Sequence, residues 1–138
     1  YAWKYEAKLS AHIYFNQKES HLVYAGSDIF LMPSLFEPCG ISQLIAMRYG
    51  TIPVVRETGG LKDTVIPYNK YTQEGTGFSF ANYNAHELLF SIKEALGLYK
   101  DKDKWKNLVI QAMKAKHDWE NSSIEYIKLY ESLLNNRR

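Results

Sequence analysis

The chain has 138 residues, of which 46% are apolar and 23% charged, so it is long enough for one domain with a hydrophobic core and is not of the disordered class. A formal net charge of +2 gives no reason to expect binding to nucleic acid or to a membrane surface. The single cysteine excludes an internal disulfide, and no apolar run reaches the ~18 residues of a membrane span. These features favour a cytoplasmic globular protein.

Short runs of apolar and β-branched residues predict strands, and longer runs with helical spacing predict helices. The expected strands are 9–15, 28–32, 51–55 and 77–81. The expected helices are 16–26, with Leu22, Val23 and Ala25 facing inward, then 40–49, 61–65, 84–99, 101–113 and a last one opened by a capping box of Ser122 and Glu125. The aromatic residues Trp105 and Trp119 occupy positions that are typical of a core.

Two strands joined by one helix within about 30 residues form a βαβ unit, which makes the strands parallel. The expected fold class is therefore α/β. We expect a single domain over 1–138, with a βαβ-type core over 1–82 and a helical tail over 83–138. Because the chain begins at Tyr1 without a preceding Met, we expect it to be a segment of a longer protein.

The stretch 33–43 joins the predicted strand 28–32 to the helix 40–49 and contains Glu37. A helix start leaves backbone N–H groups unpaired and carries positive potential, so this point favours an anion such as a phosphate. A second turn, 57–60, follows the next strand. Ligands of parallel sheets bind beyond the carboxyl ends of the strands, so both turns are expected to share one rim.

Other residues of this region have simpler explanations. A nucleophilic Cys39 would need a neighbouring base, and no histidine lies near it in the sequence, so a packing or backbone role is favoured. Arg56 fits a phosphate contact and a structural contact equally well. The four histidines lack the spacing of metal ligands, and neither a metal site nor a cofactor is expected.

The segments 24–43 and 49–65 together resemble the signature of bacterial glycogen synthases and plant starch synthases, above all in Glu-Pro-Cys-Gly at 37–40 and Thr-Gly-Gly-Leu at 58–61. The resemblance extends through 77–80 and 126–130. It implies a retaining, metal-independent glycosyltransferase of the GT-B architecture, which moves glucose from ADP-glucose to the non-reducing end of an α-1,4-glucan. The chain would then be part of the Rossmann-like C-terminal domain, with a helical tail.

The resemblance also implies roles for single residues. Glu37 matches an active-site glutamate that contacts the donor glucose, and Phe15, expected at a strand end, matches an aromatic residue beside the adenine. The segment that holds the distal phosphate matches Cys39, Gly40, Ile41 and Ser42, and a loop near the sugar matches Thr58, Gly59 and Gly60. Related glycosyltransferases carry a second glutamate eight residues after the first. Here that position is Ile45, as in glycogen synthases.

In the family, a basic pair that neutralises the departing diphosphate precedes the position of Tyr1, and an N-terminal domain supplies a Lys-x-Gly-Gly loop and most glucan contacts. Such positive groups stabilise the charge that develops on the leaving group. The chain alone is therefore expected to be inactive, and its partners in the full-length protein are expected to be ADP-glucose, the α-1,4-glucan and that N-terminal domain.

Two alternatives remain open from the sequence. One is a GT-B transferase domain that uses a UDP-sugar, against which the Glu-Pro-Cys-Gly form and Ile45 argue. The other is a non-catalytic nucleotide-binding or interaction module, since an unpaired strand edge favours self-association. A cytoplasmic location is expected for a bacterial protein and a plastid location for a plant one.

Overall fold

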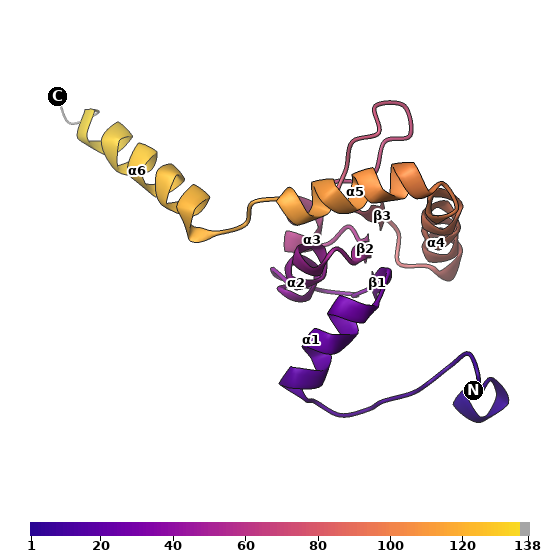
Figure 1. The fold of residues 1–138 in the computed structure, drawn as a ribbon. Coiled ribbons are helices and arrows are strands. Elements are labelled where there is room, and N and C mark those ends of the chain that lie inside the picture. The colour runs from indigo at the N-terminus through magenta and orange to yellow at the C-terminus, as the bar shows by residue number, and fades with distance from the viewer. Residues whose placement is uncertain (136–138) are drawn as a thin grey trace.

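The computed structural model describes residues 1–135. The elements in chain order are η1 (Ala2–Lys4), α1 (Gln17–Gly26), β1 (Ile29–Met32), α2 (Ser42–Tyr49), β2 (Ile52–Arg56), α3 (Gly60–Thr64), β3 (Phe78–Phe80), α4 (Ala85–Tyr99), α5 (Lys102–Lys114) and α6 (Trp119–Asn135). The sheet, the helices α2 to α5 around it and the long loop before β3 form the body of the molecule in Figure 1. The N-terminal segment before α1 and the C-terminal helix α6 extend away from this body. Within the described residues, no helix is both long and apolar enough to cross a membrane.

The three strands form a parallel sheet in the order β1-β2-β3. Ile29 of β1 pairs with Ile52 of β2, and Val54 of β2 pairs with Phe78 of β3. The predicted α/β class and the βαβ unit of β1, α2 and β2 are therefore confirmed. The register brings the carboxyl ends of β1 and β2 level, which places the loops that follow them at one edge of the sheet.

Side chains of β2 alternate between two layers, as the period of a strand requires. Val54 packs in the main core with Met47 of α2 and Leu108 of α5. Ala95 of α4 and Trp105 belong to the same core, so the predicted core position of Trp105 is confirmed. Val55 points to the opposite face, where it packs with Leu61 and Val65 at α3. The sheet is thus covered on both faces at its centre, and this rigid layer holds the loops at the carboxyl ends.

The predicted strand over 9–15 is wrong. The chain before α1 is extended but pairs with no other strand of the described structure, and Ile13 and Phe15 are 96% and 88% exposed. A segment with alternating apolar residues forms a strand only where a neighbouring strand provides hydrogen-bond partners for its backbone N–H and C=O groups. Phe15 therefore lies in an extended lead-in to α1 and not at the end of a strand.

The prediction that Leu22, Val23 and Ala25 of α1 face inward is also wrong, since Leu22 and Val23 are 72% and 63% exposed and Ala25 is exposed as well. Hydrogen bonds from its C-terminal half join α1 to the body of the molecule. Thr51 Oγ1 donates to the carbonyl oxygens of Tyr24 and Ser27. A second tie joins His21 Nδ1 and the Tyr49 hydroxyl at 3.1 Å.

α6 stands apart from the body after the linker 115–118 (Figure 1). Trp119, expected in the core, is 80% exposed, because the helix has no core to pack against within residues 1–135. The predicted capping box at Ser122 is wrong as well. The helix begins earlier, and Asp118 Oδ1 accepts the Asn121 N–H at 3.3 Å.

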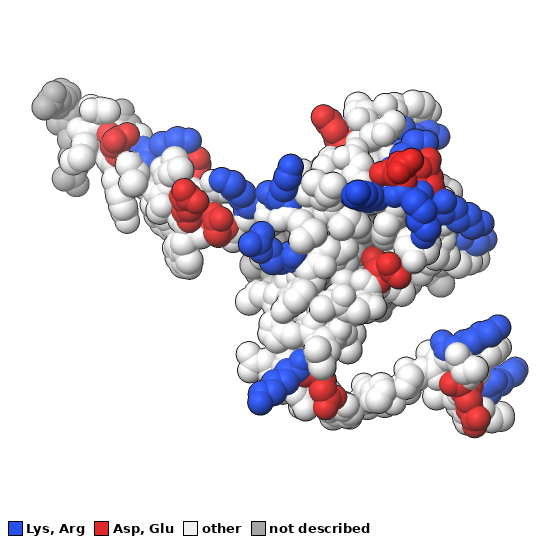
Figure 2. Space-filling view, in the orientation of Figure 1, with Lys and Arg blue, Asp and Glu red and all other residues white. Residues whose placement is uncertain are grey.

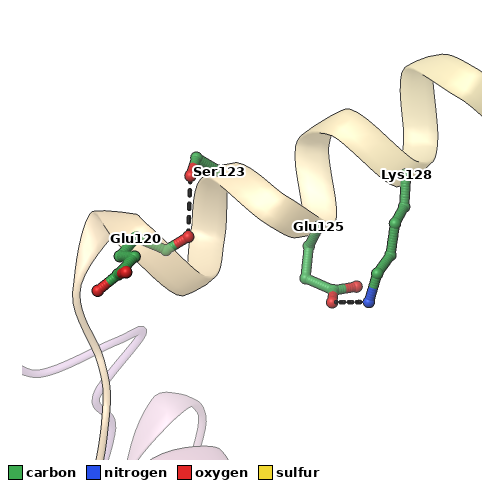
Figure 3. A network of polar contacts seen from close by, with 4 residues as sticks. All are labelled: Glu120, Ser123, Glu125 and Lys128. Atoms are coloured by element: carbon green, nitrogen blue, oxygen red, sulfur yellow. Dashed lines mark hydrogen bonds and ion pairs between the residues drawn. The ribbon is translucent and has the colours of Figure 1, made fainter.

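The polar face of α6 is held by contacts within the helix. Glu125 and Lys128 form an ion pair at 2.8 Å, and the Ser123 hydroxyl donates to the carbonyl of Glu120 at 2.8 Å (Figure 3). Its apolar side chains are about half exposed, among them Ile127 and Tyr130. Figure 2 shows acidic and basic side chains interspersed along this helix, so the visible face of the helix carries no patch of a single charge sign.

Candidate active site at the carboxyl edge of the sheet

The loop that carries Glu37 and the loop with Gly59 and Gly60 interlock through their backbones. Gly60 N–H donates to the carbonyl of Pro38 at 3.0 Å. A Cβ on Gly59 would lie 2.9 Å from the Pro38 oxygen and still closer to that of Glu37, and one on Gly60 would lie 2.7 Å from Cys39 Cα. Side chains would separate the loops, so glycine at both positions permits this contact. The expected shared rim is present in the structure.

Gly59 also has φ +46°, a conformation in which a residue with a side chain is strained. Thr58 precedes it in the turn, and its carbonyl accepts the Leu61 N–H at 3.1 Å as α3 begins. Thr58 is half-buried. The turn 58–60 is therefore a fixed wall beside the Glu37 loop.

The start of α2 has the geometry of an anion site. Gly40 has φ +75° and turns the chain into the helix, whose first residue is Ser42 and whose flanking residue Ile41 supplies no side-chain cap. In the part of the chain that the structure describes, no backbone carbonyl accepts the N–H of Ser42 or Gln43. Gln43 is fully buried, so the Ser42 amide and the positive end of the helix dipole are what this point offers to a negatively charged group.

The carboxylate of Glu37 is half-buried beside this point, and within residues 1–135 no side-chain hydrogen bond or ion pair engages it. Cys39 is an exposed free thiol. Position 45, where related glycosyltransferases carry a second glutamate, is occupied by Ile45. This residue is half-buried on α2 and borders a groove between α2, α5 and the linker 115–118. Glu37 is thus the carboxylate of the loop available to a ligand.

Gln43 was missed by sequence reasoning and is fully buried beneath the α2 turn. Its Nε2 donates to the carbonyls of Cys39 and Gly40 at 3.2 and 3.0 Å and contacts Thr64 Oγ1 at 3.1 Å. One amide group therefore joins the Glu37 loop to α3. A polar residue one position after a helix start, within an apolar stripe, is the only signal that could have drawn attention to it.

The sequence left two roles possible for Arg56, a contact with phosphate or a structural contact, and the structure shows a structural contact. Its Nη1 donates to the carbonyl of Leu35 at 2.7 Å, and its guanidinium lies 5.6 Å from the ring centre of Tyr83. Glu57, also at the end of β2, accepts the Ser79 hydroxyl at 2.7 Å. These side chains fix the loops to the sheet.

Phe15 borders a cavity that no residue of the interlocked loops lines. This cavity has a volume of about 430 Å³ and lies between the extended lead-in, α1 and β1. Tyr14, Phe15, Tyr24 and Phe30 all border the cavity, and aromatic faces suit a flat ring such as a nucleobase. The aromatic cavity at β1 is thus distinct from the interlocked loops at the start of α2.

The family model of the glycosyl transferases group 1 matches residues 1–112. The chain belongs to the group 1 glycosyltransferases. This assignment agrees with the parallel sheet and with the position of the loops at its carboxyl edge.

The glycosyltransferase chain is 60% identical, over 98% of its length, to the glycogen synthase of Caldicellulosiruptor bescii, and 57% identical, over 96%, to that of Clostridioides difficile. In each case it spans 28% of the relative's length. The resemblance to glycogen synthases drawn from the sequence motifs is confirmed.

Two solved structures are similar to the chain. One is the catalytic domain of starch synthase IV from Arabidopsis thaliana bound to ADP and acarbose, with a TM-score of 0.84 and 37% identity over 94% of this chain and 27% of that one. The other is sucrose-phosphate synthase from Thermosynechococcus elongatus, with a TM-score of 0.67 and 22% identity over 98% of this chain and 33% of that one. The second shows the likeness of fold alone, and the first extends the likeness to a starch synthase.

Proposed function

We propose that the chain forms the donor-binding part of a glycogen or starch synthase that transfers glucose from ADP-glucose to the non-reducing end of an α-1,4-glucan with retention. The observation that carries this proposal is the interlocked pair of loops, one of which contains Glu37 and leads directly into the start of α2. The identity to bacterial glycogen synthases and the likeness to a starch synthase bound to ADP supply the chemical class.

In this proposal the phosphate remote from the base lies at the start of α2. The backbone of Cys39, Gly40 and Ile41 surrounds it and the Ser42 hydroxyl donates to it. Three features support this placement: the unpaired amide of Ser42, the positive φ of Gly40 and the position of Ser42 in the first helical turn. Hydrogen bonds from backbone N–H groups to an anion are among the stronger ones in proteins.

Glu37 is proposed to contact the donor glucose, and the turn of Thr58, Gly59 and Gly60 to border the sugar on the opposite side. The adenine is proposed to lie against Phe15. A carboxylate beside the sugar can accept hydrogen bonds from its hydroxyl groups and favour the positive charge that develops on the ring. Cys39 takes part through its backbone.

The departing diphosphate needs positive groups to stabilise its charge. The resemblance places the family's basic pair before Tyr1, and Arg56 of this chain already donates a hydrogen bond to the carbonyl of Leu35. We therefore expect the 138-residue chain by itself not to transfer glucose. Transfer by the purified chain from ADP-glucose to glycogen would refute this expectation.

We also infer that α6 packs, through its exposed apolar side chains, against the N-terminal domain of the same protein. Burial of such a face is the usual source of stability for an amphipathic helix. Since the relatives are bacterial glycogen synthases, we infer a cytoplasmic location; the plastid location stays a prediction from the sequence.

The proposal is tested by calorimetric titration of the full-length protein that carries this chain with ADP-glucose and UDP-glucose. Ser42→Ala is expected to weaken binding of ADP-glucose about tenfold, which corresponds to about 1.4 kcal/mol. Glu37→Ala is expected to lower turnover about 100-fold, measured as transfer of glucose from ADP-glucose to glycogen. Ser123→Ala, on α6, is the matched control and should change neither value.

Unchanged affinity for ADP-glucose in Ser42→Ala would refute the phosphate assignment, and normal turnover in Glu37→Ala would refute the role of the carboxylate. Tighter binding of UDP-glucose than of ADP-glucose would support the UDP-sugar alternative.

A further inference from the structure

Gln43 lies in the first turn of α2, and its side chain is fully buried. Its Nε2 donates to the carbonyls of Cys39 and Gly40 at 3.2 and 3.0 Å. The same nitrogen donates to Thr64 Oγ1 at 3.1 Å, at the end of α3. An amide oxygen in that place could not bond to two carbonyls, so the partners fix the orientation of the amide. One buried nitrogen therefore contacts both the turn that leads into α2 and the end of α3.

A hydrogen-bond network continues from Gln43 to the second loop. The Thr64 hydroxyl accepts from Gln43 and donates to the carbonyl of Gly60 at 2.6 Å. The Gly60 N–H in turn donates to the carbonyl of Pro38 at 3.0 Å. Pro38 is the chain neighbour of Cys39, whose carbonyl accepts from Gln43. The network of Gln43, Thr64 and Gly60 is therefore closed, and it joins the two interlocked loops through side chains as well as through the backbone.

The other end of the Gln43 amide supplies an independent observation. Its Oε1 is buried and has no hydrogen-bond partner within residues 1–135. A Cβ on Gly40 would lie 2.6 Å from this oxygen, so the glycine makes room for it. A buried acceptor without a partner lowers stability. A polar group that a fold keeps at such a cost is typical of a functional site.

The network lies between two parts of the proposed donor site. The phosphate turn 39–42 is proposed to hold the phosphate, and the sugar turn 58–60 to border the sugar. Gln43 contacts the phosphate turn directly and reaches the sugar turn through Thr64. A misplacement of about 1 Å can lower the rate of an enzyme about 100-fold, even when its cause lies away from the reacting atoms. The spacing of the two turns is therefore a quantity that the reaction depends on.

We propose that Gln43 is a positioning residue for glucose transfer, whose buried amide fixes the phosphate turn relative to the sugar turn through Thr64. The phosphate and the sugar of one donor molecule then meet their contacts at the same time. The inference rests on the proposed function. ADP has no sugar to place against the sugar turn. Loss of the link at Thr64 is therefore expected to lower the rate of transfer and to leave the affinity for ADP almost unchanged.

The test uses the full-length protein that carries this chain, with ADP as the binding probe and maltotriose as the acceptor. Thr64→Val removes the hydroxyl group and keeps the shape of the side chain. It is expected to lower kcat for transfer from ADP-glucose about tenfold, while the affinity for ADP stays within about twofold. Thr64→Ser keeps the hydroxyl group and is expected to restore the rate. A purely structural role of the network would not separate the rate from the affinity in this way.

A double-mutant cycle tests whether Gln43 and Thr64 act together. Gln43→Met removes the amide and is expected to lower kcat at least as much as Thr64→Val. The double variant should be no slower than Gln43→Met, because both changes break the same network. Gln111→Met is the matched control, since Gln111 of α5 also donates to a loop carbonyl, that of Gln73 at 2.8 Å, but lies outside the network. It should leave the rate unchanged.

A wild-type rate in Thr64→Val would overturn the proposal, and so would losses that add up in the double variant. A wild-type protein that transfers no glucose from any donor would refute the proposed function instead. Hydrogen exchange of the full-length protein without ligand then still tests the link between the turns. The peptide that covers 58–64 should exchange about tenfold faster in Thr64→Val, because the Gly60 region is held less firmly. Wild-type exchange of this peptide would overturn the link.

Discussion

At the scale of single residues, Gly59 is the position where the candidate site depends most on the absence of a side chain. Its positive φ and its contact with the Glu37 loop both exclude a Cβ. Gly59→Ala is expected to lower the free energy of unfolding by about 3 kcal/mol, since backbone strain and a steric clash act together. Urea denaturation of the chain measures the change.

Gly26→Ala is the control for that experiment, because a methyl group there meets open space. It should leave the unfolding free energy within about 0.5 kcal/mol of the wild-type value. Equal stability of the two variants would show that the two loops do not interlock in solution.

Glu87 provides a pH-dependent contribution at the start of α4. The pKa of its carboxyl group lies below the ordinary value, first because Asn82 Nδ2 donates to it at 2.6 Å and then because the Asn82 backbone N–H donates to it at 2.8 Å. A lowered pKa in the folded state means that the stabilisation is present above the unfolded pKa, about 4.3, and is lost as the pH falls through the folded pKa.

Glu87→Gln is therefore expected to be less stable than the wild type at neutral pH, and the difference should shrink as the solution becomes more acidic than about pH 4. Thermal unfolding at a series of pH values measures it, with Glu131→Gln on α6 as the control. A difference that stays constant down to pH 2 would contradict the assignment.

At the scale of elements, α5 supports the site by packing against α2. Leu108 is fully buried in the main core, which also contains Met47 of α2. Leu108→Ala is expected to cost about 3 kcal/mol of unfolding free energy, because it leaves a cavity under α2, the helix whose start is the proposed phosphate site. Leu96→Ala, at a position that is 47% exposed on α4, should cost far less. Denaturant unfolding of both variants makes the comparison, and similar losses would show that α5 does not support α2.

At the scale of the whole molecule, several surfaces of the chain lack partners within residues 1–135, and two of them are considered for association. One is the free edge of β1, beside which Leu31 is 46% exposed, and the other is the apolar face of α6. Unpaired strand edges and apolar helix faces both favour association. The isolated chain is expected to self-associate as its concentration rises.

Sedimentation velocity over a range of concentrations measures that association. Truncation after Asp118 separates the two surfaces, because it removes α6 and keeps the edge of β1. A monomer at every concentration would refute the prediction, and association that disappears on truncation would assign it to α6.

How much the sequence could predict depended on whether a feature is local. The strands β1, β2 and β3 and the helices from α2 to α5 were recognisable because apolar spacing and helix-start residues lie within a few positions of one another. The strand expected over 9–15 failed because its pattern is local but a strand needs a neighbour. The role of Gln43 was not recognisable either, because two of its partners, Cys39 and Gly40, are near in sequence and the third, Thr64, is 21 residues away.

The sequence by itself determined the α/β class, the βαβ unit, the family resemblance and the two turns that end at one rim, since each is encoded in residue order and short spacing. Only the tertiary structure decided that the turns interlock through Gly59 and Gly60, that Arg56 is bound to Leu35, and that α1 and α6 expose apolar faces. The physical reason is that burial and hydrogen bonding depend on which distant surfaces meet, and the spacing of residues along the chain does not specify those meetings.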